Sequence, residues 1–325
     1  MSATQASGTA HERSPPAGIA SVVLPDYPSI TVARVELGLT LYLDDAMHWA
    51  RQGAERVLRS FLAIVPPDHL SWYSTSRMEG WRKLEGEAMG EVARMLSLGW
   101  SEGRPRHLFE LTLTDDVEAP SCGFRYGEID PRRADRVGVI EVTLPQECHP
   151  GYLLPIARAA VEAGPLWAGV GGYAVRLGES FRADAFDVAW AWSQRFVGLD
   201  IQDHERMAWA VREGLPGTGW LTILGSALMA AREVNPEAPR AHPWTDPTIT
   251  TELASGNLLI KAGEAPTLGD RNFFEDAPAY REVAHAAADL FVADPPELLG
   301  HFRDRRGTRA WFRRLLAPVP PRPNR

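Results

Sequence analysis

The hydrophobic positions of this chain follow two periods, one of two residues and one of about 3.6, which predicts both strands and helices. Over residues 35–43 every odd position is apolar, whereas the even positions include polar side chains such as Glu36. This alternation is typical of a strand with one face in a core and one in water. Residues 46–62 then show helical spacing after an N-cap signal at Asp44-Asp45. We therefore expect a strand followed by a helix that covers its apolar face.

The same two periods continue to the end of the chain. Further strands are predicted at residues 69–74, 109–113, 137–144, 167–177, 220–224, 249–253 and 258–261. Further helices are predicted at residues 78–98, 152–163, 181–196, 205–212, 277–292 and 295–316. The strands mostly alternate, and few connections resemble βαβ units. The pattern therefore favours an α+β fold, with mostly antiparallel sheet covered by amphipathic helices.

Composition divides the chain into three predicted segments. Residues 1–30 begin with a Ser/Thr/Ala-rich stretch and are expected to form a disordered arm, and residues 301–325 a basic helix with a Pro-rich tail. Residues 31–300 form the main α+β domain, with a candidate internal boundary at 146–151. No apolar run approaches the roughly 20 residues of a membrane span, and the N-terminus lacks the pattern of a secretory or transit signal. We expect a cytoplasmic protein without membrane association.

The charge is distributed unevenly along the chain. The whole sequence has 34 basic and 42 acidic residues, a net charge of −8. The last 25 residues carry eight Arg and one Asp, a net charge of +7, which leaves −15 over the first 300 residues. An acidic body of this kind opposes binding to nucleic acid and to acidic membranes, and it favours a partner with a basic surface.

Sequence-local motifs for catalysis, metals or cofactors are absent from the chain. Cys122 and Cys148 form no CxxC pair, and the nine histidines form neither an HxxxH nor an HExxH pattern. The stretch Gly169-Val-Gly-Gly172 lacks the spacing of a dinucleotide-binding or P-loop motif, which favours close backbone packing. The sequence therefore predicts no catalytic residue, no metal site and no cofactor.

Two alternatives stay open on the residues alone. The carboxylate doublets Asp44-Asp45 and Asp115-Asp116 are explained by caps and turns, but an opposed pair would permit hydrolysis of a glycan or another polar substrate. Tryptophans near predicted turns would then serve as platforms, namely Trp72, Trp81, Trp100 and Trp244. The second alternative is phosphate or nucleic-acid binding by the Arg-rich C-terminus. The simpler interpretation of that segment is that its apolar residues dock while its arginines pair with the acidic body.

Three phrases occur in a characteristic order: Gly171-Gly-Tyr-Ala174, Arg195-Phe-Val-Gly-Leu-Asp200 after an aromatic helix, and Trp220-Leu-Thr-Ile-Leu-Gly225 before a small-residue helix. Together they resemble the type VI secretion immunity family, whose members pair with VRR-NUC nuclease effectors. The resemblance covers about residues 31–300, and Gly219 stands where the family has Asn. The motif positions are Gly171, Gly172, Tyr173, Arg195, Gly198, Leu199, Asp200, Trp220, Leu221, Thr222, Leu224 and Gly225.

The resemblance implies an immunity protein that binds a cognate type VI effector, a nuclease, and neutralises it by direct stoichiometric occlusion. It implies no enzymatic activity and no catalytic residue. The motif residues are expected to determine the fold, and they do not identify the residues that contact the partner. The continuous apolar run at 220–224 in particular predicts that Trp220, Leu221 and Leu224 are buried.

Overall fold

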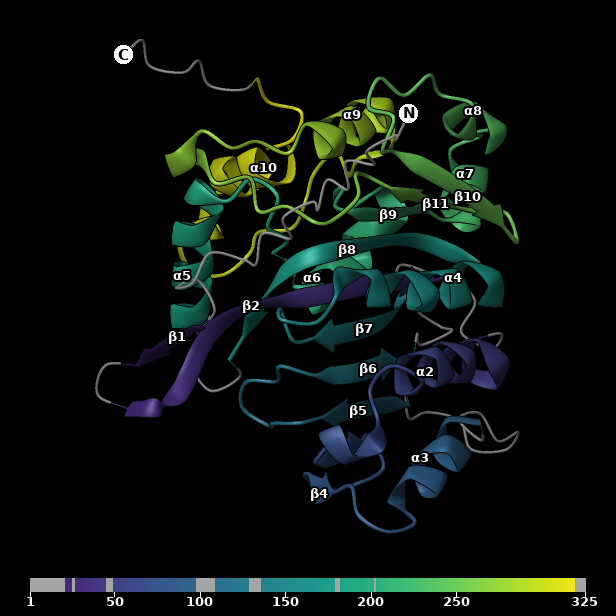
Figure 1. Ribbon diagram of the computed structural model, residues 1–325, viewed down its shortest axis with the longest axis vertical. Helices are drawn as coiled ribbons and strands as arrows, with labels where there is room; N and C mark the ends of the chain where they lie inside the picture. The colour runs from purple at the N-terminus through teal and green to yellow at the C-terminus, as the bar shows by residue number, and fades with distance from the viewer. Residues whose placement is uncertain are drawn as a thin grey trace, which may run out of the picture.

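A large antiparallel sheet forms the centre of the protein (Figure 1). The computed structural model describes residues 21–24, 27–44, 49–97, 109–128, 136–178, 182–201 and 203–318. The strands are β1 (Ser21–Leu24), β2 (Tyr27–Leu43), β3 (Trp72–Thr75), β4 (Arg82–Lys83), β5 (Glu110–Thr114), β6 (Gly123–Gly127), β7 (Gly138–Leu144), β8 (Leu166–Leu177), β9 (Leu221–Leu224), β10 (Thr250–Ala254) and β11 (Asn257–Lys261). Their order is β10-β11-β9-β8-β2-β7-β6-β5-β3-β4, β1 pairs with β2, and every pairing is antiparallel.

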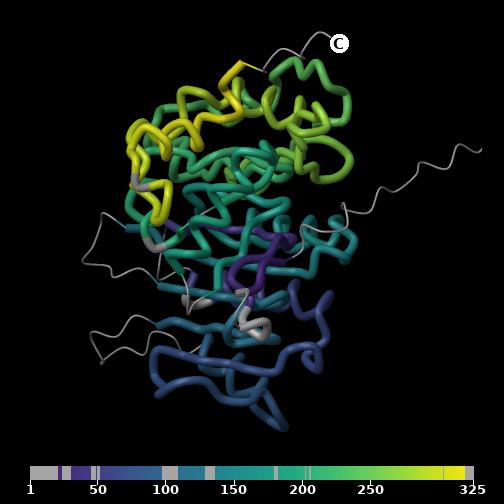
Figure 2. The backbone as a smooth tube through the Cα atoms, turned by 90° about the vertical axis from the view of Figure 1, so that its left-hand side faces the viewer, coloured from purple at the N-terminus to yellow at the C-terminus, as the bar shows by residue number. Residues whose placement is uncertain are grey.

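Helices lie on both faces of the sheet. They are α2 (Ala54–Leu62), α3 (Ala88–Ser97), α4 (Leu153–Ala163), α5 (Arg182–Arg195), α6 (His204–Ala210), α7 (Ser226–Ala231), α8 (Glu237–Arg240), α9 (Pro278–Ala286) and α10 (Arg305–Phe312). Short helical turns are η1 (Trp49–Gly53), η2 (Pro67–His69), η3 (Pro150–Tyr152), η4 (Val211–Glu213), η5 (Arg271–Phe273), η6 (Ala288–Leu290) and η7 (Gly300–Arg303). The long axis of the molecule runs from α3 and β4 at one end to α9 and α10 at the other (Figures 1 and 2). This mixture confirms the predicted α+β class.

On the apolar face of the sheet, α4 packs against β2, and α2 packs against β6 and α4. Leu39 of β2 lies opposite Val142 of β7, which lies opposite Phe124 of β6, so the three side chains share one face. The ring of Phe61 in α2 contacts Phe124 on that face, with ring centroids 5.9 Å apart. All four side chains are buried. The predicted helix over an apolar sheet face is therefore present.

The other face of β2 is not in water, contrary to the prediction. Glu36 and Thr40 are each 5% exposed, and Tyr42 is fully buried. Segments far along the chain cover this face, because α5 packs against β2 and β8, and α6 packs against β7. The alternation of apolar and polar residues along a strand shows that one of its faces is polar. It does not show whether a helix from later in the chain covers that face.

Two predicted helices begin later than expected, and both have glycines at positive φ before their first residue. The helix predicted at 78–98 begins only at Ala88, since Gly80 and Gly86 adopt positive φ angles of 71° and 60°. The helix predicted at 295–316 has no helical residue before Gly300, whose φ is 59°, and α10 begins only at Arg305. The first predicted helix starts as the turn η1 at Trp49, and residues 45–48 lie outside the described residues.

The predicted division of the chain into an N-terminal arm, a main domain and a C-terminal tail stays a prediction, and so does the candidate boundary near 146–151. One sheet includes strands from both sides of residues 146–151. At the C-terminal end Phe302, Trp311 and Leu315 are buried in the core. Residues 1–20 lie outside the described part. None of the helices within the described residues is long and apolar enough to cross a membrane.

Candidate functional site

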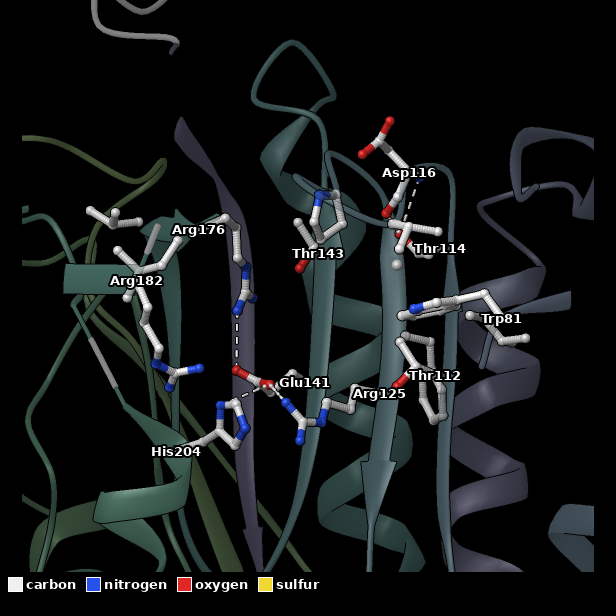
Figure 3. A pocket seen from close by; sticks show the side chains of 17 residues that line it. Trp81, Thr112, Thr114, Asp116, Arg125, Glu141, Thr143, Arg176, Arg182 and His204 are labelled. Carbon is white, nitrogen blue, oxygen red and sulfur yellow. Dashed lines mark hydrogen bonds and ion pairs between the residues drawn. The ribbon is translucent and has the colours of Figure 1, made fainter. Parts of the chain in front are cut away.

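A pocket of about 300 Å³ opens on the polar face of the sheet, away from α2 and α4 (Figure 3). The strand register builds its floor. Thr112 of β5 lies opposite Arg125 of β6, which lies opposite Glu141 of β7. In the neighbouring row Thr114 lies opposite Gly123, which lies opposite Thr143. Because side chains alternate along each strand, these two rows point to the same face of the sheet. The second row has no side chain at Gly123, which leaves space between Thr114 and Thr143.

Arg176 of β8 reaches this pocket because Gly38 of β2 has no side chain. A Cβ at Gly38 would lie 3.0 Å from the Arg176 Nη2 atom and 2.8 Å from the Ala174 Cβ atom. The guanidinium can thus cross β2 and meet Glu141, with Nη1 and Oε1 3.1 Å apart. Its Nη2 also donates to the Val142 carbonyl at 3.0 Å. Two strands that are not neighbours are connected through one arginine.

Glu141 is the electrostatic centre of the pocket (Figure 3). The His204 Nδ1 atom of α6 lies 3.1 Å from the carboxylate, and the Arg125 Nη1 atom lies 4.0 Å from it. Burial by itself would raise the pKa of Glu141, but His204, Arg176 and Arg125 together outweigh burial and hold this pKa well below its usual range. A carboxylate of this kind stays ionised at neutral pH. It is poorly suited to the proton transfers of a general acid or base.

The rim of the pocket adds one further ion pair and one aromatic ring. Arg182, at the start of α5, lies 3.2 Å from Asp203, which is buried. Trp81 lines the opposite side and is 38% exposed. The pocket can hold a small polar group through its guanidinium and threonine side chains. Within the described residues, no group of three His, Cys, Asp or Glu could hold a metal ion.

The sequence did not single out the Glu141 cluster. Its members come from β6, β7, β8 and α6, and sequence separation hides their proximity. One signal of the cluster is present in the sequence. Arg125, Glu141 and Arg176 are charged residues inside strands, and such residues usually pair with an opposite charge on a nearby strand.

The two carboxylate doublets have structural contacts in the described residues. The Asp115 carboxylate accepts hydrogen bonds from the backbone N–H groups of Ser121 and Cys122, at 3.1 and 3.0 Å. Asp116 accepts from the N–H groups of Glu118 and Ala119, at 2.8 and 2.9 Å. These are turn contacts, as expected for acidic residues after a strand.

The remaining candidates also make structural contacts. Asp44 accepts from the Trp167 indole N–H at 2.6 Å, and Asp45 lies outside the described residues. Burial raises the pKa of the Cys122 thiol to about 12, which disfavours the thiolate. Among the tryptophan platforms, Trp81 lines the pocket, Trp72 and Trp244 are half-buried, and Trp100 lies outside the described residues.

The first motif phrase lies in β8, where this strand pairs with β2 on one side and begins to pair with β9 on the other. Gly171 pairs with Leu39 of β2 and with Leu221 of β9. A Cβ at Gly171 would lie 3.0 Å from the Leu39 Cδ1 atom, so the glycine permits close approach of the strands. Gly172 has a φ of 148° and faces Trp220, and the half-buried Tyr173 accepts, through its carbonyl, the N–H of Asp200 at 2.8 Å.

The second motif phrase joins the end of α5 to β8. Arg195 makes a bidentate ion pair with the buried Asp270, with Nη2 and Oδ2 2.6 Å apart. The Gly198 N–H donates to the Leu268 carbonyl at 2.8 Å, and a Cβ at Gly198 would overlap the Thr267 carbonyl oxygen. The last residue, Asp200, donates its N–H to β8 and accepts the Val175 N–H at 2.8 Å.

The C-terminal segment contacts this second phrase directly. The Arg314 Nε atom donates to the Val197 carbonyl at 2.8 Å, and its Nη2 donates to the carbonyl of the buried Leu199 at 2.9 Å. Burial lowers the pKa of Arg314 to about 10, which leaves it charged at neutral pH. Arg305 and Arg309 of α10 both pair with Asp294. The prediction that these arginines pair with the acidic body is therefore confirmed for Arg305 and Arg309.

The third motif phrase forms β9 and its two ends. Trp220, Leu221 and Leu224 are buried, which confirms the prediction that they belong to the core. The Trp220 indole donates to the Gly263 carbonyl at 3.1 Å, and the Thr222 hydroxyl accepts the Gly219 N–H at 3.2 Å. The motif residues are Gly171, Gly172, Tyr173, Arg195, Gly198, Leu199, Asp200, Trp220, Leu221, Thr222, Leu224 and Gly225, and they lie along β8, β9 and the α5–α6 connection.

The motif phrases lie where β8 pairs with β2 and β9 and in the α5–α6 connection, and a family match gives the class of protein that carries them, a type VI secretion immunity protein. The family model described as "Type VI immunity for VRR-NUC" matches residues 54–315. The chain belongs to this family of immunity proteins for VRR-NUC effectors. The match begins later and ends later than the resemblance expected at 31–300, and it includes α10.

One solved structure has a similar fold over most of both chains. It is the Pseudomonas aeruginosa T6SS protein PA0821, with a TM-score of 0.73 and 18% sequence identity. The likeness covers 91% of this chain and 86% of that chain. At this identity the comparison shows the shared fold. No curated protein matches the chain.

Proposed function

We propose that this protein binds its cognate VRR-NUC effector directly, in a one-to-one complex, and blocks the nuclease without enzymatic activity of its own. The observation that carries this proposal is the family match over residues 54–315. In the producing cell, such a complex would form in the cytoplasm before the effector is exported. The effector, not nucleic acid, is the binding partner.

Charge supports direct occlusion as the mechanism. A nuclease presents a cationic surface to DNA phosphates. The first 300 residues of this chain carry a net charge of −15, so they can approach the same surface as an acidic competitor. The low pKa of Glu141 in the pocket agrees with a non-catalytic role for that cluster, because a permanently ionised carboxylate is a weak proton donor and acceptor at neutral pH.

The test is a titration of a purified cognate VRR-NUC effector with the immunity protein. Plasmid cleavage should fall linearly and end at one molar equivalent, and size-exclusion chromatography with light scattering should give the mass of a 1:1 complex. Protection at far less than one equivalent, or rescue of a poisoned host without a detectable complex, would show enzymatic reversal of damage and contradict the proposal.

A further inference from the structure

Two adjacent phenylalanines protrude from the loop between β11 and α9. Phe273 is 68% exposed and Phe274 is 47% exposed. Among the described residues, the other large exposed apolar side chains are separate in sequence: Val23, Trp81, Tyr152 and Trp209. Trp81 lines the pocket, and the Arg136 guanidinium lies 3.7 Å from the centre of the Trp209 ring. Phe273 and Phe274 therefore stand out as a paired apolar surface.

The loop that carries these rings is held in place by many contacts. The buried Asp270 caps η5 by accepting the Asn272 N–H at 3.0 Å, and it forms the bidentate ion pair with Arg195 of the second motif phrase. The N–H groups of Phe273 and Glu275 both donate to the Asp270 carbonyl at 3.0 Å. Arg195 thus positions the loop from the end of α5. The rings are presented by a fixed backbone.

The base of the loop is tied to the rest of the molecule on two further sides. Arg271 donates to the Gln194 carbonyl at 3.2 Å. Asp276 pairs with the buried Arg281 at 2.8 Å, and the Nη1 atom of Arg281 also donates to the Ala317 carbonyl at 2.6 Å. α5, α9 and the segment after α10 therefore all hold this loop.

Phe274 has a backbone conformation that its side chain disfavours. Its φ is 56° and its ψ is 29°, in the left-handed region, which is uncommon for residues other than glycine, asparagine and aspartate. A large apolar residue that is both strained and exposed contributes little to the stability of the isolated fold. Such strain concentrates at functional sites, where a partner uses the geometry that it creates.

We propose that Phe273 and Phe274 are the anchor by which this protein binds its effector, and that they insert into an apolar pocket on the effector surface. The inference rests on the proposed function, because it names the contact surface for that same partner. Aromatic residues dominate the energy of protein interfaces, and a rigid loop loses little entropy on binding. Two charged groups lie beside the rings: Glu275 is exposed, and the Arg195 guanidinium lies 6.0 Å from the centre of the Phe273 ring. Arg195 is already neutralised by its ion pair with Asp270, so Glu275 supplies the unbalanced charge next to the rings. Its carboxylate suits the basic rim of a nuclease better than an acidic lipid surface.

The experiment measures effector binding by full-length variants. Phe273→Ala and Phe274→Gly should each raise the dissociation constant about 30-fold or more, the range of interface hot spots. Phe274→Gly should at the same time leave thermal stability unchanged or raise it, since glycine accepts the left-handed conformation. Tyr152→Ala is the matched control, because Tyr152 is also 47% exposed but lies before α4. It should leave the dissociation constant unchanged.

Wild-type binding separates this inference from the proposed function. If the wild-type protein does not bind the effector, the proposed function fails. If the wild type binds and both Phe variants bind equally well, the anchor inference alone is overturned. A wild-type dimer that the Phe variants convert to a monomer, without a change in effector affinity, would also overturn it, because a second copy would then cover the rings.

Discussion

Glu36 and Glu141 are buried carboxyl groups on neighbouring strands, but their surroundings have opposite effects on ionisation. Glu141 faces His204 and two arginines, which together lower its pKa despite burial. Burial dominates at Glu36 and raises its pKa to about 8, although the Gln146 N–H donates to it at 2.7 Å and Arg34 lies 3.8 Å away. The number of cations that reach each carboxyl group decides the result.

Glu36→Gln should change how stability depends on pH. In the folded wild type Glu36 holds a proton between its ordinary pKa of 4.5 and its raised pKa of about 8, whereas the unfolded chain releases it. Stability therefore falls as pH rises through this window. The variant lacks this loss, so its stability relative to wild type should increase by roughly 2–4 kcal/mol from pH 5 to pH 8. Urea denaturation at both pH values measures the difference.

Glu110→Gln provides the control for this experiment, because Glu110 is exposed. Its stability relative to wild type should be the same at pH 5 and pH 8. If Glu36→Gln shows the same pH dependence as wild type, Glu36 is ionised in the folded protein, and the account of its burial is wrong.

At the scale of elements, the pairing of β9 with β8 depends on two glycines that have no side chain to keep the strands apart. Gly219 and Gly225 flank β9, and a Cβ at Gly219 would lie 2.8 Å from the Gly171 carbonyl oxygen. At Gly225 a Cβ would overlap the Leu166 carbonyl oxygen. Both obstacles are backbone atoms of β8, which is paired on both sides and cannot shift easily.

Gly225→Ala should lower the free energy of unfolding by roughly 2–4 kcal/mol, since backbone must move to admit the methyl group. Gly90→Ala is the matched control. Gly90 lies in α3, and a methyl group there would meet no atom within 4 Å, so this change should be neutral or stabilise by about 0.5–1 kcal/mol. Chemical denaturation of both variants tests the contrast, and equal effects would refute it.

Trp220→Ala should be severe for a different reason, because it leaves a cavity under β9. The residue is 1% exposed, and its indole hydrogen bond to Gly263 is also lost. We expect a loss of roughly 3–5 kcal/mol in unfolding free energy, measured by denaturant titration. If the variant kept wild-type stability but lost its effector, Trp220 would be a contact residue and not a core residue.

At the scale of the whole molecule, an acidic body carries a basic end. The exposed arginines of that end are divided: Arg305 and Arg309 pair with Asp294, whereas Arg306 and Arg313 are exposed on and just after α10. Because the apolar residues of this end are buried, its arginines can be changed without removing the segment. The acidic body and the basic end can thus be tested separately for effector binding.

Raising the salt concentration should slow association with the effector more than it speeds dissociation. Charges at the rim of an interface act mainly on the association rate, and physiological salt screens them over about 8 Å. The double variant Arg306→Glu and Arg313→Glu should associate as fast as wild type or faster. Stopped-flow or surface-plasmon measurements over a salt series give the rates. A collapse of the association rate with an intact circular dichroism spectrum would show that the basic end makes the contact.

The amino-acid pattern predicted the α+β class, most of the strands and the burial of Trp220, because these follow from periodicity and continuous apolar runs within a few residues. It placed Arg195 in a motif without revealing Asp270 as its partner. Three features needed the tertiary structure: the covered polar face of β2, the cluster around Glu141 and the exposed Phe273-Phe274 pair. Each depends on contacts between segments far apart in the sequence, and local periodicity contains no information about which distant helix, strand or charged side chain arrives at a given face.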